Sequence, residues 1–144
     1  MTRISAAEFQ AMAGGKAKAT RTDQEGPLHK SILRFLQIAL PPDAVLHHSP
    51  NELDMSGADA ARQVAKARSL GTRKGWGDLE FVWRGRFYMI EVKHPNNTSG
   101  LSKEQAEVRQ DIIMAGGHFA VVRSINEARD ALQNWGIIKD DRKK

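Results

Sequence analysis

The segment GDLEFVWRGRFYMIEVK, residues 77–93, places two carboxylates and a lysine close to one another in the chain. Asp78, Glu91 and Lys93 flank or end two runs rich in aromatic and β-branched residues, a composition that predicts a β-hairpin. If the hairpin turns at Arg84-Gly85, Asp78 lies directly opposite Glu91. Lys93 follows Glu91 by two residues and therefore projects from the same face of its strand.

The two carboxylates and the lysine of this hairpin could together bind a metal ion and act on a phosphate. Like charges that face each other destabilise a strand pair unless a cation lies between them. Two carboxylates at that separation offer the hard oxygen ligands that Mg²⁺ or Mn²⁺ prefers. A lysine beside the ion can orient or deprotonate a water, or stabilise the charge that develops on a phosphate. The alternative is a surface hairpin whose charges face solvent, since so short a pattern often occurs by chance. Glu80 shares the face of Asp78 and is expected to have a cross-strand or supporting role.

The elements that must position this hairpin are predicted from hydrophobic spacing and capping residues. Helices are expected at residues 27–40, 58–70, 103–115 and after Ser124, and strands at 44–48, 79–83, 87–92 and 118–122. Ser102 with Gln105, and Ser124 with Glu127, are candidate capping boxes. The strand, helix and strand from 87 to 122 form a parallel βαβ unit. We therefore predict an α/β fold: a single domain whose mixed β-sheet is flanked by helices.

Composition limits the class of protein. A chain of 144 residues, 40% apolar and 27% charged, is typical of one globular domain. No apolar run approaches the length of a membrane span, and the N-terminal residues lack the apolar region of a secretory signal. With no cysteine, disulfides and thiolate zinc sites are excluded, and a cytoplasmic location is expected. We expect a flexible N-terminal arm at residues 1–24, a domain at 25–138 and a charged tail at 139–144.

The charge of the chain points to a polyanion partner. Lysine and arginine number 22 against 17 acids, which gives a net charge of +5. Five basic residues and no acid occur between residues 60 and 77: Arg62, Lys66, Arg68, Arg73 and Lys74. A cluster of this kind is typical of nucleic-acid-binding surfaces, although a solvated helix face is the alternative.

Several linked motifs resemble the VRR-NUC family of the PD-(D/E)XK nuclease superfamily. They are GTRKGWGDLEFV, FYMIEVK, GLSKEQ and AVVRSINEA, and the resemblance extends over about residues 25–136. The G-x-P-D motif of the family occurs here as Gly75-Trp76-Gly77-Asp78, with glycine in place of the proline. The resemblance implies a restriction-endonuclease-like core. It also implies that Asp78, Glu91 and the Val92 carbonyl bind Mg²⁺ or Mn²⁺, and that Lys93 serves catalysis.

The resemblance adds two further candidates to the site. Glu25 corresponds to a glutamate near the start of the first helix of the family, although GP at 26–27 is expected to interrupt that helix, and a charge placed at a helix N-terminus is the alternative. Gln105 corresponds to the glutamine of the LSxxQ motif, on the same helix face as Val108 and Ile112. It is expected to contact substrate, water or Lys93, and its alternative role is the capping box.

The sequence thus predicts a Mg²⁺- or Mn²⁺-dependent DNA endonuclease. The expected nucleic-acid-binding residues are Arg62, Lys66, Arg73, Lys74 and Lys103. The resemblance further implies 5′-phosphate and 3′-hydroxyl ends, branched or four-way junction DNA as substrate, and a bacterial or phage-encoded homodimer. Exposed Trp135, Ile137 and Ile138 are expected to be buried in the dimer. A DNA-binding module without catalysis is the alternative, but degenerate nuclease folds lose a carboxylate or the lysine, and all three are present here. An RNA-binding protein would leave the carboxylate pair unexplained.

Overall fold

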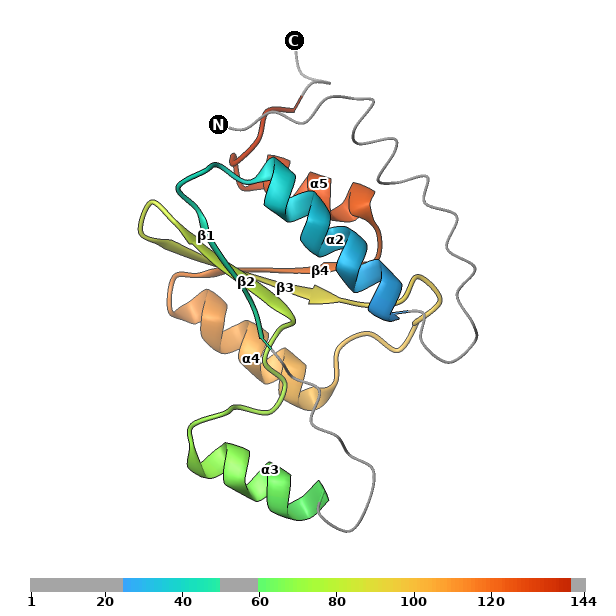
Figure 1. Cartoon of the computed structure of the whole chain (residues 1–144), viewed down its shortest axis with the longest axis vertical. Coiled ribbons are helices and arrows are strands. Elements are labelled where there is room, and N and C mark those ends of the chain that lie inside the picture. The colour runs from blue at the N-terminus through green and yellow to red at the C-terminus, as the bar shows by residue number, and fades with distance from the viewer. Residues whose placement is uncertain (1–24, 50–59, 141–144) are drawn as a thin grey trace.

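A four-stranded sheet lies at the centre of the computed structural model, which describes residues 25–49 and 60–140 (Figure 1). The strands are β1 (Val45–His48), β2 (Leu79–Trp83), β3 (Arg86–Val92) and β4 (His118–Val122), and they lie side by side in this order. β1 and β3 run antiparallel to β2, whereas β4 runs parallel to β3. The sheet is therefore mixed, and the predicted α/β class is confirmed.

Helices cover both faces of this sheet (Figure 1). α2 (Glu25–Ala39) and α5 (Ile125–Asn134) pack on one face, and α4 (Lys103–Met114), the crossover between β3 and β4, packs on the other. α3 (Ala60–Ser69) stands away from the sheet, beyond α4. No described helix is long and apolar enough to cross a membrane.

The β2–β3 hairpin has the predicted turn. Arg84 and Gly85 both have positive φ, 51° and 74°, which is the conformation of a two-residue type I′ turn. This turn aligns Leu79 with Ile90. The same register, continued by one residue, places Asp78 opposite Glu91, as the sequence predicts.

The main core lies between the sheet and the layer formed by α2 and α5. Each strand contributes alternate residues, and α2 contributes Ile32, Phe35, Leu36 and Ala39, all fully buried. The predicted exposure of the residues after α5 is wrong. Ile137 is fully buried, Ile138 packs against the core, and the Trp135 ring lies 5.1 Å from that of Tyr88. α5 ends at Asn134, and the chain turns at Gly136 (φ 74°) back onto the core.

The first helix differs from the prediction at its start. α2 begins at Glu25, so Gly26 and Pro27 do not interrupt it. Proline is tolerated in the first turn of a helix, because the N–H that it lacks would have no partner within the helix. The predicted arm at 1–24, residues 58 and 59 of the second predicted helix, and residues 141–144 of the tail lie outside the described residues.

Candidate active site

Asp78 is fixed at the entry to β2 by the neighbouring strand. Its Oδ2 accepts a hydrogen bond of 2.8 Å from the backbone N–H of Val92. In an extended strand the N–H and the carbonyl of one residue point to the same side. The Val92 carbonyl is therefore directed toward the side of β3 on which Asp78 lies. Three oxygen donors, the two carboxylates and this carbonyl, belong to one end of the hairpin.

Glu91 is the buried member of the carboxylate pair. It is 5% exposed, and its Oε1 accepts a 2.8 Å hydrogen bond from Gln105 Nε2. Lys93 Nζ lies 3.7 Å from the same oxygen, and the Lys93 backbone N–H donates to the Val122 carbonyl, which holds the end of β3 against β4. A buried carboxylate is costly unless it is paired, and Lys93 supplies the pairing charge. Because Asp78 adds a second carboxylate, the three side chains retain one formal negative charge.

Gln105 forms the predicted capping box and also contacts a side chain of the candidate site. Ser102 Oγ accepts from the Gln105 backbone N–H (3.2 Å), and Gln105 Oε1 accepts from the Ser102 backbone N–H (2.9 Å), so the capping box is complete. The Nε2 of the same amide reaches Glu91. In the candidate site, Gln105 therefore contacts the carboxylate of Glu91 and not the expected Lys93.

These two roles of Gln105 can be separated by substitution. Ser102→Ala and Gln105→Ala should each lower the free energy of unfolding by about 1 kcal/mol, because each removes part of the helix cap. Only Gln105→Ala should also lower the rate of DNA cleavage, by about 10- to 100-fold, because it removes the hydrogen bond that orients Glu91. Urea denaturation and single-turnover cleavage measure the two effects. Equal cleavage by the two variants would restrict Gln105 to capping.

The loop before Asp78, residues 71–77, is docked on α4. Arg73 Nη2 lies 2.6 Å from Asp111 Oδ2, and Lys74 Nζ lies 3.4 Å from Glu104 Oε1. The pKa of Glu104 is lowered from its ordinary value, first by a hydrogen bond from its own backbone N–H and then by Lys74. Two of the predicted phosphate-binding residues are therefore held in ion pairs with α4. No local pattern in the sequence indicates these long-range pairs.

The lack of a side chain at Gly75 allows the loop to lie this close to α4. Gly75 has a φ of +86°, and a Cβ added to it would lie 2.5 Å from the carbonyl carbon of Glu104 and 2.7 Å from the backbone nitrogen of Gln105. The loop thus contacts the backbone that carries Gln105. The run of three glycines at 71, 75 and 77 was the signal in the sequence that could have pointed to this contact.

Gly75→Ala should therefore lower the free energy of unfolding by more than an ordinary substitution at a positive φ. Gly116, with a φ of +92° after the other end of α4, has nothing within 4 Å of an added Cβ and is the matched control. Gly116→Ala should cost about 1–3 kcal/mol of backbone strain with cleavage retained. Gly75→Ala should cost more and slow cleavage, because the first turn of α4 must move together with Gln105. Equal unfolding free energies in urea for the two variants would contradict this role of Gly75.

Glu80 holds the other side of the loop, as its expected supporting role requires. Its Oε2 accepts from Trp76 Nε1 at 2.7 Å, and its Oε1 lies 3.0 Å from His47 Nδ1 and 3.2 Å from Ser49 Oγ. The carboxylate therefore joins β1, β2 and the loop rather than pointing into the Asp78–Glu91 pair. His48, next to His47, lies on the opposite face of β1, where its ring contacts that of His29 at 4.6 Å.

The other predicted site residues lie on α2, α3 and α4. Glu25 is the first residue of α2, and its side chain lies outside the described part of the structure. His29, which lies one turn after it in α2, contacts the ring of His48 at 4.6 Å, and His48 Nδ1 lies 3.2 Å from the Asp78 carbonyl. The first turn of α2 thus approaches the Asp78 end of the sheet. Lys103 is exposed at the start of α4, and Arg62 and Lys66 are exposed on α3.

The donor set fits a hard divalent cation. Within residues 25–49 and 60–140, no three histidine, cysteine, aspartate or glutamate side chains converge to hold a metal ion. Mg²⁺ commonly takes only one or two protein carboxylates and keeps water or phosphate in its other positions. Asp78, Glu91 and the Val92 carbonyl supply that kind of incomplete oxygen set, and the residual negative charge favours a cation there.

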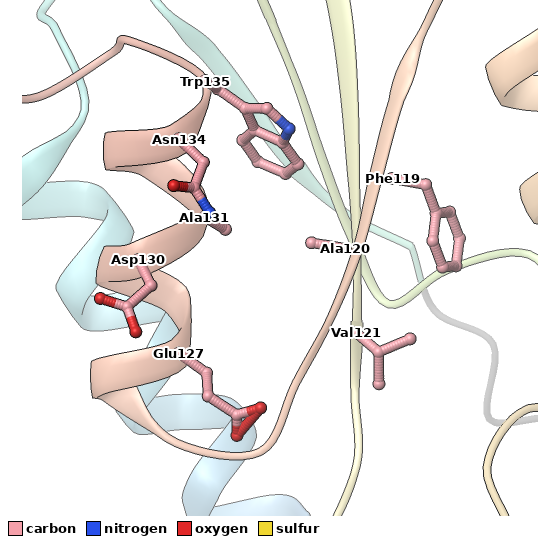
Figure 2. Close-up of a pocket in the computed structure, with 8 residues that line it drawn as sticks. All are labelled: Phe119, Ala120, Val121, Glu127, Asp130, Ala131, Asn134 and Trp135. Atoms are coloured by element: carbon pink, nitrogen blue, oxygen red, sulfur yellow. The ribbon is translucent and has the colours of Figure 1, made fainter.

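A groove separate from the candidate site lies between β4 and α5. It has a volume of about 380 Å³, and its lining on α5 includes Glu127, Asp130 and Asn134 (Figure 2). Trp135 closes one end. None of Asp78, Glu91, Lys93 or Gln105 lines this groove, so it is not part of the candidate site.

Comparisons with known proteins agree with this architecture. No protein-family model and no curated protein matches the sequence. A solved structure described as "VRR_NUC domain protein" superposes with a TM-score of 0.62 at 19% sequence identity, over 81% of this chain and 90% of that one. At this identity the likeness is one of fold. The mixed sheet and its flanking helices therefore form a VRR_NUC-like fold.

Proposed function

We propose that this chain is a Mg²⁺- or Mn²⁺-dependent endonuclease that hydrolyses phosphodiester bonds in DNA. The observation that carries the proposal is the convergence of Asp78, Glu91, Lys93 and Gln105 at one end of the β2–β3 hairpin. A buried carboxylate and lysine pair could be only structural. Asp78, directly across the hairpin, makes that alternative weaker, because a second acid at this position is destabilising without a cation.

The residues have distinct tasks in this proposal. Asp78, Glu91 and the Val92 carbonyl would hold the ion, which when bound polarises the phosphate and lowers the pKa of a water. Gln105 keeps the Glu91 carboxylate oriented by its 2.8 Å hydrogen bond. Lys93, which is mostly buried beside Glu91, is placed to orient or deprotonate the attacking water or to stabilise negative charge on the phosphate. Cleavage would leave 5′-phosphate and 3′-hydroxyl ends.

Branched DNA, and four-way junctions in particular, is the proposed substrate, and a homodimer is the proposed active form. Resolution of a four-way junction needs two symmetric cuts, and two copies related by a two-fold axis supply two equivalent sites. Ile137 is fully buried, and Trp135 and Ile138 are partly buried against the core, so these residues do not form the exposed apolar surface expected for the interface. The dimer therefore rests on the symmetry argument alone.

The test is a comparison of labelled linear, flapped and four-way DNA, with Mg²⁺, Mn²⁺ or Ca²⁺ in turn. Faster cleavage of the branched substrates with Mg²⁺ or Mn²⁺ supports the proposal. Light scattering of the same protein should give about twice the chain mass of 16.0 kDa. A monomer that cuts linear and four-way DNA equally would remove the junction preference and the dimer but not the nuclease. DNA binding without cleavage under any of these ions would favour the alternative, a non-catalytic DNA-binding module on a nuclease fold.

A further inference from the structure

Among the described residues, α3 does not pack extensively against any other helix or strand. Each of its side chains that the structure describes is exposed, and Figure 1 shows it standing beyond α4, away from the sheet. It has only ten residues. Helices shorter than about 12–15 residues are marginal in water unless a packed face stabilises them. None of the α3 side chains that the structure describes provides a buried face of this kind.

The charges on α3 identify what would stabilise it. Arg62 and Lys66 lie one turn apart on the same face of the helix, and Arg68 lies near its C-terminal end. No ion pair between described residues includes any of these three, whereas Arg73 and Lys74 of the following loop are paired with α4. With no acid between residues 60 and 77, the helix complements a polyanion.

The position of α3 in the chain links it to the candidate active site. The loop that follows α3 is docked on α4 and leads directly into Asp78. The nine residue steps from Ser69 to Asp78 span at most about 30 Å, so α3 can reach backbone phosphates within about ten base pairs of the scissile bond.

We propose that α3 is a DNA-docking helix whose helical structure is stabilised by binding: it lies along the phosphate backbone of a duplex arm, and Arg62 and Lys66 contact the phosphates. Arg73 and Lys74 instead fix the loop to α4. This inference rests on the proposed nuclease function. It adds to that function a separation of roles. α3 binds the DNA and becomes ordered on binding, whereas the β2–β3 hairpin carries the catalytic residues and is ordered before DNA binds.

Hydrogen exchange provides the first test, on the full chain in EDTA with a DNA that has arms of about 20 base pairs. The backbone amides of residues 64–69 should exchange rapidly in the unbound protein and become protected when DNA is added. The amides of β3 should be protected in both states, because that strand lies between β2 and β4. Protection of 64–69 that depends on protein concentration and not on DNA would identify a second copy as the partner and overturn the proposal.

Substitutions test the same idea through affinity. Arg62→Ala with Lys66→Ala should weaken binding on the order of tenfold or more at about 0.1 M salt, and reduce the slope of log affinity against log salt by about two units. The matched control is Lys30→Ala with Arg34→Ala, two exposed basic residues at the same spacing on α2, which should leave the slope unchanged. Ala65→Gly should weaken binding by about fivefold, which corresponds to the helix propensity lost. It should leave the Tm unchanged, because α3 does not support the core.

The outcomes separate this inference from the proposed function. If wild-type protein cuts DNA but the Arg62 and Lys66 variant binds like its control, α3 is not the docking element and the nuclease stands. If wild-type protein neither binds nor cuts DNA, both proposals fail. If Ala65→Gly lowers the Tm without changing affinity, α3 is a structural helix of the domain and the docking role is wrong.

Discussion

Asp78→Asn should abolish metal-dependent cleavage of DNA while leaving DNA binding intact or tighter. The substitution removes one ligand charge from the ion site, and it also removes repulsion between the carboxylate and the phosphate. The asparagine retains a side-chain oxygen that can accept the hydrogen bond from the Val92 backbone N–H, so the hairpin should persist. Labelled-DNA cleavage and fluorescence anisotropy measure the two properties.

Glu91→Gln should have the same effect for a related reason. The glutamine can still accept from Gln105 Nε2, but it no longer offers a charge to the ion or to Lys93. Both variants should unfold cooperatively in urea, which distinguishes loss of chemistry from loss of fold. Normal cleavage by Asp78→Asn would show that this residue is not a ligand.

Lys93→Ala should lower the turnover number by roughly 10² to 10⁴-fold, the range expected when a general base or a charge-stabilising group is lost. Binding of Mn²⁺ should be retained, because the lysine is not a ligand. Single-turnover cleavage at saturating metal measures the effect. Unchanged turnover would mean that Lys93 only balances the buried charge of Glu91.

Lys93→Arg distinguishes the two catalytic roles. The guanidinium remains protonated at any working pH and cannot act as a base. Substantial cleavage by Lys93→Arg would therefore assign the lysine an electrostatic role. If Arg fails as completely as Ala, and the wild-type rate rises with pH as one group deprotonates, a role as general base is favoured.

Local rules were sufficient to predict the elements that carry the candidate site. The Arg84-Gly85 turn requires two positive φ angles, and that requirement sets the register that brings Asp78 opposite Glu91. Ser102 and Gln105 form the predicted cap, and the same spacing directs Gln105 toward the sheet. Each of these features depends on residues that are near in the chain, or on a hairpin with a short turn.

The features that sequence patterns missed depend on contacts between distant segments. The docking of Gly75 on α4, and the ion pairs of Arg73 and Lys74, join segments about thirty to forty residues apart and leave no periodic pattern. The burial of Ile137 was missed because α5 ends at Asn134 and the chain then turns back at Gly136. Hydrophobic periodicity places a residue on a helix face but does not reveal such a return.

The central claim, that Asp78 and Glu91 hold a divalent cation beside Lys93, is tested most directly by isothermal titration of the full chain with Mn²⁺. Wild-type protein should give a saturable binding heat. Asp78→Asn and Glu91→Gln should each lose most of it, and Lys93→Ala should retain it. Equal heats for wild-type protein and both carboxylate variants, with all of them folded, would contradict the account, because the ion would then bind elsewhere or not at all.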